Sequence, residues 1–123
     1  MRLARKGFTL VELIVVLVVI GIIASIVIAR FVSAKEKAYI ASMKSDLKNF
    51  ALYEQFYADD NNGDYFGGDG IAQGFKPTVD IAVTATRVPG PPPEWNAIAI
   101  HAKTPKKCTI GVVNPPEWTI DCS

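Results

Sequence analysis

A long apolar run at residues 8–29 constrains this chain more than any other feature of its sequence. The residues in it that are not plainly apolar are Thr9, Glu12, Gly21 and Ser25. At about 1.5 Å per residue, a helix of this length extends roughly 33 Å, which matches the hydrocarbon thickness of a bilayer. We therefore expect residues 8–29 to form a helix that crosses a membrane once.

A single carboxylate interrupts this run. Glu12 lies near one end, where the cost of a membrane-embedded charge is smaller than the roughly 2.5–3.5 kcal/mol expected at the centre. If the chain were cut after Gly7, Phe8 would carry a free α-amino group about one helical turn from Glu12. The amine of a neighbouring chain is then a candidate partner for this carboxylate.

The sequence Gly-Phe-Thr-Leu-Val-Glu-Leu at residues 7–13, followed by an apolar helix, resembles the signature of type IV prepilins and of the related type II secretion pseudopilins. The resemblance implies that prepilin peptidase cleaves between Gly7 and Phe8 and methylates the amine of Phe8. It also implies that Glu12 pairs with the methylated amine of Phe8 on an adjacent subunit, which sets the axial register of a filament. An ordinary secretory signal or an uncleaved signal anchor is the alternative, but the apolar region of a secretory signal, of about 7–15 residues, would be shorter.

Charge indicates the orientation in the membrane. Removal of the leader, residues 1–7, takes away three of the thirteen basic residues, so ten remain against twelve acidic ones and the net charge changes from +1 to −2. Basic residues that flank a span tend to stay in the cytoplasm, so we expect the leader inside and the chain after Ala29 outside. Arg30, Lys35 and Lys37 oppose this assignment, but the leader cluster and the family resemblance outweigh them.

The apolar run continues into an amphipathic pattern without a proline or glycine to stop it. Apolar residues recur mostly at spacings of three and four: Phe31, Ala34, Ala38, Ile40, Met43, Leu47, Phe50 and Ala51. We predict one helix over residues 8–58, ended by the Asp- and Asn-rich stretch 59–64. That stretch has poor spacing for a calcium loop, and the glycine-rich residues 63–74 are expected to cover a sheet edge or contact a neighbour.

Strand patterns follow in the remaining domain, residues 59–123. Alternation predicts strands near residues 79–86 and 97–102, with one or two more within 108–113 and 118–122. His101 is expected on the solvent side of its strand, and the repeated Pro-Pro-Glu-Trp, at residues 92–95 and 115–118, is interpreted as turn chemistry. The predicted fold class is α+β: a long helix packed on a small antiparallel sheet of three or four strands, as in pilins.

Cys108 and Cys122 lie in a part of the chain that is predicted to be outside the cytoplasm, where a disulfide is expected. Two free thiols are the alternative. A metal site is less favoured because His101 is the only histidine and no Cys-x-x-Cys spacing exists. By resemblance, residues 108–122 correspond to the exposed disulfide loop of type IV pilins.

Enzymatic constellations are missing from the sequence, so we expect no catalytic residue, cofactor or metal. A short basic cluster, Lys103, Lys106 and Lys107, could contact DNA, but a solvated turn is the favoured interpretation.

By resemblance, the chain is expected to be a structural subunit of a bacterial type IV pilus serving adhesion, motility or DNA uptake. It would start in the inner membrane and polymerise into a surface filament, with prepilin peptidase and the inner-membrane assembly machinery as partners. The alternatives are a periplasmic type II secretion pseudopilin and a single-span anchored binding domain. Ala29, where many pilins have proline, favours a pseudopilin, whereas the cysteine loop favours a pilin.

Overall fold

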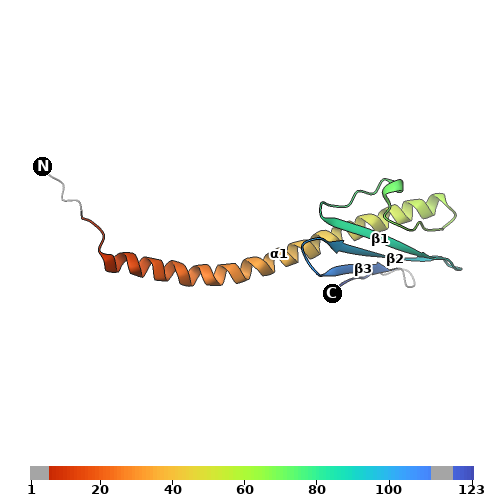
Figure 1. Cartoon of the computed structure of the whole chain (residues 1–123). Helices are drawn as coiled ribbons and strands as arrows, with labels where there is room; N and C mark the ends of the chain where they lie inside the picture. The colour runs from red at the N-terminus through yellow and green to blue at the C-terminus, as the bar shows by residue number, and fades with distance from the viewer. Residues whose placement is uncertain (1–5, 112–117) are drawn as a thin grey trace. The chain divides into compact units, whose positions relative to one another are not determined.

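The computed structural model describes residues 6–111 and 118–123. Its elements are α1 (Leu10–Asp60), the short 3-10 helix η1 (Ile71–Gln73), β1 (Ile81–Val88), β2 (Glu94–His101), β3 (Lys107–Gly111) and β4 (Ile120–Cys122). The chain divides into two compact units, Met1–Lys35 and Glu36–Ser123, and α1 contributes to both (Figure 1). The expected turn around residues 114–116 and the start of the second Pro-Pro-Glu-Trp copy lie outside the described residues.

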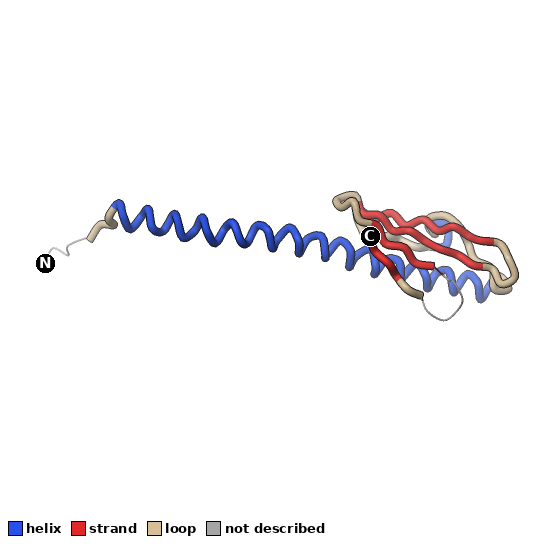
Figure 2. Tube along the Cα trace, turned by 90° about the horizontal axis from the view of Figure 1, so that it is seen from below, coloured by secondary structure: helices blue, strands red, loops and turns tan. Residues whose placement is uncertain are grey.

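The first unit consists of the leading part of α1. The helix begins at Leu10 and passes Gly21 and Ala29 without a break (Figure 2). The expectation of one continuous helix is therefore confirmed, and α1 is not unwound where many pilins have a proline.

The second unit combines the rest of α1 with a four-stranded antiparallel sheet in the order β1-β2-β3-β4 (Figure 1). Neighbouring strands are also neighbours in sequence, and the register pairs Ile81 with His101 and Cys108 with Cys122. Such consecutive antiparallel pairing needs only short connections. The predicted α+β class is confirmed, with four strands.

The core of this unit lies between α1 and the inner face of the sheet. From α1 and the loop that follows it come Met43, Leu47, Phe50, Ala51, Phe66 and Phe75, and from the strands come Ile81, Val83, Ala85, Trp95, Ala97, Ala99, Cys108 and Ile110. Phe50 is central, because its ring centroid lies 5.0 Å from that of Phe75, 5.3 Å from Phe66 and 6.1 Å from Trp95. Burial of these rings supplies much of the energy that holds the helix on the sheet.

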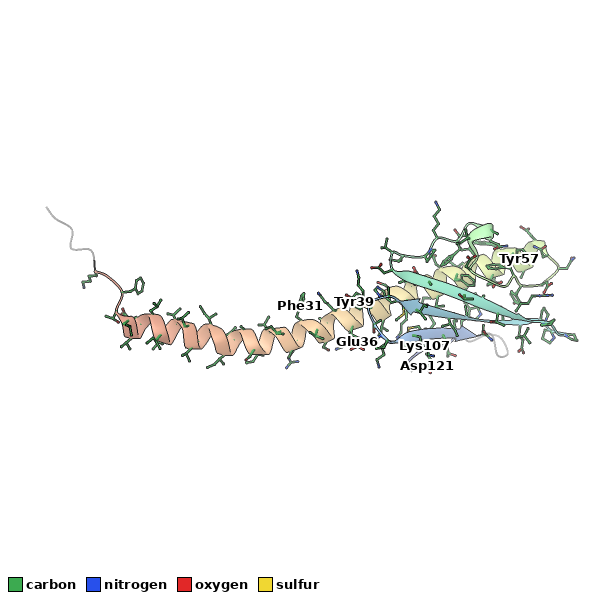
Figure 3. The ribbon with its side chains drawn as sticks, in the orientation of Figure 1. Phe31, Glu36, Tyr39, Tyr57, Lys107 and Asp121 are labelled. Atoms are coloured by element: carbon green, nitrogen blue, oxygen red, sulfur yellow. A yellow bond between two sulfur atoms is a disulfide. The ribbon has the colours of Figure 1, made fainter. Side chains whose placement is uncertain are left out.

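The expectation that His101 faces solvent is wrong. The side chain is 8% exposed, and its ring stacks on Tyr39 of α1 with the centroids 4.3 Å apart (Tyr39 is labelled in Figure 3). The inner face of β2 carries Trp95 and small alanines, and His101 is in phase with Trp95. The bulkier Ile98 and Ile100 point outward, because the tryptophan and not the isoleucines decides which face is buried.

The acidic stretch after α1 forms a helix-terminating turn, as predicted. The helix runs to Asp60, two residues beyond the expected end, and the N–H of Gly63 donates to the carbonyl of Ala58 at 2.7 Å. Asn62 adopts φ 57° and Gly63 φ 82°, the left-handed geometry in which helices commonly end. Within the described ranges, no group of three or more His, Cys, Asp and Glu could hold a metal ion.

The connection between α1 and β1, residues 61–80, is here called the crossing loop. It covers part of the exposed edge of β1, where Gly68 and Ala85 exchange two backbone hydrogen bonds of 2.9 and 2.7 Å. The glycine-rich segment thus covers a sheet edge, which was the first of its two predicted roles.

Candidate functional site

The candidate processing site is the short segment before α1. Gly7 and Phe8 are exposed, and the Phe8 side chain, at 90% exposure, does not pack against the rest of the chain. A Cβ atom built on Gly7 would meet nothing within 4 Å. The glycine is therefore not required by the fold of this segment, and any need for it must come from a protein that acts on the junction.

Glu12, the predicted assembly residue, also caps the helix to which it belongs. Its Oε2 atom accepts the N–H of Thr9 at 2.8 Å, and the Thr9 hydroxyl accepts the N–H of Glu12 at 3.2 Å. This reciprocal pair is a capping box, which satisfies two backbone donors that the first turn of a helix leaves without partners. Sequence reasoning assigned Glu12 a role between subunits and missed this local one, although Thr-x-x-Glu before an apolar run is its signature.

The apolar surface of the first unit has no partner within the described chain. The helix window with a mean hydropathy of 3.2 is 0% buried, and it is long and apolar enough to cross a membrane. Figure 3 shows side chains standing out all around this part of α1. A surface of this size is normally covered by lipid or by another protein.

A second exposed apolar surface lies on α1 within the globular unit, on the side away from the sheet. Leu52 and Phe56 are 50% and 66% exposed and lie one helical turn apart. The same face continues towards the N-terminus through exposed small or uncharged residues: Ala38, Ala41, Ser45 and Asn49. We call this set the uncharged helix face. A second helix can approach closely where side chains are small and no charge has to be desolvated.

The structure joins Cys108 of β3 and Cys122 of β4 by a disulfide. The two cysteines are direct partners in the sheet register, and Cys108 is fully buried in the core. Next to them, the backbones of Lys107 and Ser123 exchange two hydrogen bonds of 3.0 Å. The bridge therefore fastens the short strand β4 to the rest of the sheet, where three residues of pairing alone would contribute little.

The basic cluster offers less free charge than its sequence indicates. Lys103 forms an ion pair with Asp80, 2.7 Å between Nζ and Oδ2, and this contact raises the pKa of Lys103 and lowers that of Asp80. Lys106 and Lys107 are exposed. A lysine already paired with a carboxylate releases fewer counterions on binding a phosphate backbone, so this cluster favours DNA binding less than its sequence does.

Two buried acidic residues of α1 escaped the sequence analysis. Asp46 and Glu54 fall on the same helix stripe as Met43 and Phe50, and both are buried. Asp46 accepts the N–H and the hydroxyl of Thr78 at 2.7 and 2.8 Å, and Glu54 accepts the N–H of Phe66 at 3.0 Å. The spacing of Asp46 and Glu54 could have indicated this, because it places both carboxylates on the apolar stripe of the helix. A carboxylate that is buried there needs a hydrogen-bond donor.

Residues 2–28 match a family described as the prokaryotic N-terminal methylation motif. The type II secretion system core protein G of Pseudomonas aeruginosa is 37% identical over 60 residues, which cover 49% of this chain and 42% of that protein. The protein G of Escherichia coli is 35% identical over 66 residues, covering 48% and 46%. The type IV wide pilus major component PilA4 of Thermus thermophilus is 33% identical over 57 residues, covering 46% and 44%.

The matched region spans less than half of the length of each of these relatives. No solved structure matches the chain. The family motif, the relatives and the helix-on-sheet architecture agree with the resemblance drawn from residues 7–13. Residues 2–28 thus carry the prokaryotic N-terminal methylation motif, and the N-terminal half of the chain is similar to type II secretion core protein G and to a type IV pilin component.

Proposed function

We propose that the chain is a structural subunit of a type IV pilus, cleaved after Gly7 and polymerised through α1 into an extracellular filament. The observation that carries this proposal is the exposed apolar helix, most of which lies within the methylation-motif match at residues 2–28. In a membrane, lipid covers this surface, and little drives such helices together. In a water-surrounded filament, burial of the same surface between subunits becomes strongly favourable.

Assembly would use both ends of α1. The capped N-terminus presents the Glu12 carboxylate one turn from residue 8, where the methylated amine of a neighbouring subunit is its proposed partner. The uncharged helix face, ending at Leu52 and Phe56, offers a second surface on which an apolar helix of another subunit can lie. The amphipathic part of α1 thus has one face for its own sheet and another for the filament.

A second candidate is a pseudopilin of a type II secretion system, in which a short periplasmic filament drives export. The similarity to core protein G from several organisms, Pseudomonas aeruginosa and Escherichia coli among them, favours it. The Cys108–Cys122 bridge supports the pilus assignment, since a C-terminal disulfide is more typical of pilins by resemblance. In either role, the proposed partners are prepilin peptidase, the inner-membrane assembly machinery and further copies of this chain.

The deciding experiment is electron microscopy of filaments sheared from producing cells, with mass spectrometry of their N-terminal peptide. Long fibres built of a chain that starts at methylated Phe8 would support the pilus proposal. Processed protein confined to the envelope would support the pseudopilin instead. Processed or unprocessed protein that never polymerises under any level of expression would overturn both and support a membrane-anchored binding domain.

A further inference from the structure

The Glu54 carboxyl group is buried in an unusual way. The side chain has no exposed surface, and while Oε2 accepts the Phe66 N–H, Oε1 has no hydrogen-bond partner among the described residues. A buried carboxylate without a compensating donor is costly, whereas a neutral carboxylic acid at the same place is much less so. The geometry therefore favours the protonated form.

Among the described residues, Glu54 takes part in no ion pair. Its neighbours along the same face of α1 are Phe50 and Tyr57, and the crossing loop brings Phe66, whose ring packs against that of Tyr57. Asp64, two residues before Phe66 in the loop, is ion-paired with Arg87 of β1. Burial raises the pKa of Glu54 to about 7, and the Phe66 N–H is the group that opposes this shift.

Phe66 lies at the point where the crossing loop passes from α1 to the sheet edge. On its N-terminal side, Asp64 accepts from Arg87 Nε at 2.8 Å, and on its C-terminal side, Gly68 pairs with Ala85. Gly70 then packs its backbone against the ring of Phe50. The Glu54–Phe66 bond is thus the buried polar attachment within a segment, residues 64–70, that covers β1.

We propose that Glu54 is a proton-operated latch, which holds residues 64–70 against α1 and the β1 edge while neutral and releases its proton when this segment opens. Opening brings the carboxyl group into water, where it ionises, whereas the closed segment keeps it protonated. The open segment leaves the N–H and C=O of Ala85 unpaired at the edge of β1. An unpaired edge of this kind can accept a strand from another chain.

The direction of the pH effect follows from proton binding in the two states. In the closed state the pKa of Glu54 is about 7, and in the open state it returns to about its ordinary value of 4.5. Below pH 4.5 both states are protonated, so opening is independent of pH. Between these pKa values each pH unit favours opening by up to about tenfold, and above the higher value the effect levels off.

Hydrogen exchange of the Phe66 and Gly68 amides in the full-length chain in detergent micelles tests the latch. After correction for intrinsic exchange, we expect wild-type protection to fall by up to about tenfold per pH unit between pH 5 and 7. Glu54→Gln keeps an oxygen acceptor but cannot ionise, so its protection should be flat with pH. The control Asp64→Asn, which removes an exposed carboxylate from the same loop, should retain the wild-type slope.

Flat protection in the wild type, or the wild-type slope in Glu54→Gln, would overturn the proposal. If Glu54→Gln does not fold, the titration of the Glu54 Cδ resonance in the wild-type chain decides the matter. A midpoint near 7 supports the latch, and a midpoint near 4.5 overturns it. These measurements are made on single chains in micelles, so their outcome is independent of whether the chain forms a pilus or a pseudopilus.

Discussion

Thr9 and Glu12 cap the N-terminus of α1 reciprocally, through hydrogen bonds of 2.8 and 3.2 Å between each side chain and the other's N–H. Under the proposed cleavage, Thr9 becomes the second residue of the mature chain, so the cap lies beside the new amino terminus. Glu12 then contributes in two ways, as a hydrogen-bond acceptor for its own helix and as a negative charge for a neighbouring amine. These contributions can be separated by substitution.

Glu12→Gln should be processed normally but should assemble poorly, because glutamine can complete a capping box yet carries no charge. Glu12→Ala should lose both contributions, with the first turn of α1 weakened by about 1 kcal/mol. Processing is followed by the mass of the N-terminal peptide, and assembly by the yield of sheared filaments.

Thr9→Ala is the matched control for these two variants, since it removes the hydroxyl acceptor of the capping box and keeps both the Glu12 charge and its hydrogen bond from the backbone N–H of residue 9. Its filament yield should remain well above that of Glu12→Gln. Wild-type yield from Glu12→Gln would contradict the charge-pairing mechanism.

Gly7→Ala should block cleavage while leaving the fold unchanged. An alanine Cβ at this position meets nothing within 4 Å, so a block must arise from the peptidase that reads the junction. Gly21→Ala also introduces a Cβ into open space and should be processed, with α1 stabilised by roughly 0.5–1 kcal/mol. Gel mobility and intact mass distinguish precursor from mature chain, and full cleavage of Gly7→Ala would refute the assigned site.

Asp46→Ala should destabilise the globular unit by about 2–3 kcal/mol, because it removes two charge-assisted hydrogen bonds and leaves the Thr78 N–H without its acceptor. Urea unfolding of the detergent-solubilised chain, followed by the fluorescence of buried Trp95, measures the change. Asp59, an exposed residue of α1, offers a control. The free energy of unfolding of Asp59→Ala should stay within about 0.5 kcal/mol of the wild-type value. Equal effects of the two variants would argue against an anchoring role for Asp46.

Gly70→Ala should be one of the most damaging alanine substitutions in the crossing loop. The new Cβ would lie 2.8 Å from Cε2 of Phe50, and the backbone has φ 71°. Gly63→Ala, at φ 82° in open space, carries the backbone strain without the clash. We expect the Gly70 variant to unfold more easily than the Gly63 variant by about 1–3 kcal/mol, the usual cost of overpacking. Indistinguishable urea midpoints would show that the aromatic cluster relaxes freely.

The overall architecture could be predicted because its signals are local. The apolar run and the three-to-four spacing after it specify α1, and the alternation of Ile81, Val83 and Ala85 specifies the buried face of β1. For β2 both faces carry apolar residues, so alternation by itself does not distinguish inside from outside. That choice depends on how Trp95 packs near Phe50 and how His101 stacks on Tyr39, which is information from distant parts of the chain.

The candidate site was predictable to a similar degree. The motif at residues 7–13 predicts a processing junction, which stays a prediction, and the Thr-x-x-Glu pattern predicts the helix cap that the structure shows. The hydrogen bonds of buried Asp46 and Glu54 could not be predicted in this way, because their donors belong to a loop without periodicity. A carboxylate in an apolar stripe indicates that a donor exists but does not identify Thr78 or Phe66 as that donor.

Side-chain oxygens of α1 accept three hydrogen bonds from the crossing loop, and two of the three donors are peptide N–H groups, those of Phe66 and Thr78. Every residue except proline offers a peptide N–H. These bonds therefore depend more on the backbone path of the loop than on the identity of its residues. Many outward-facing loop positions can therefore change identity while the path is kept. A lineage under pressure to alter its visible surface could vary this segment widely and leave the shape of the subunit intact.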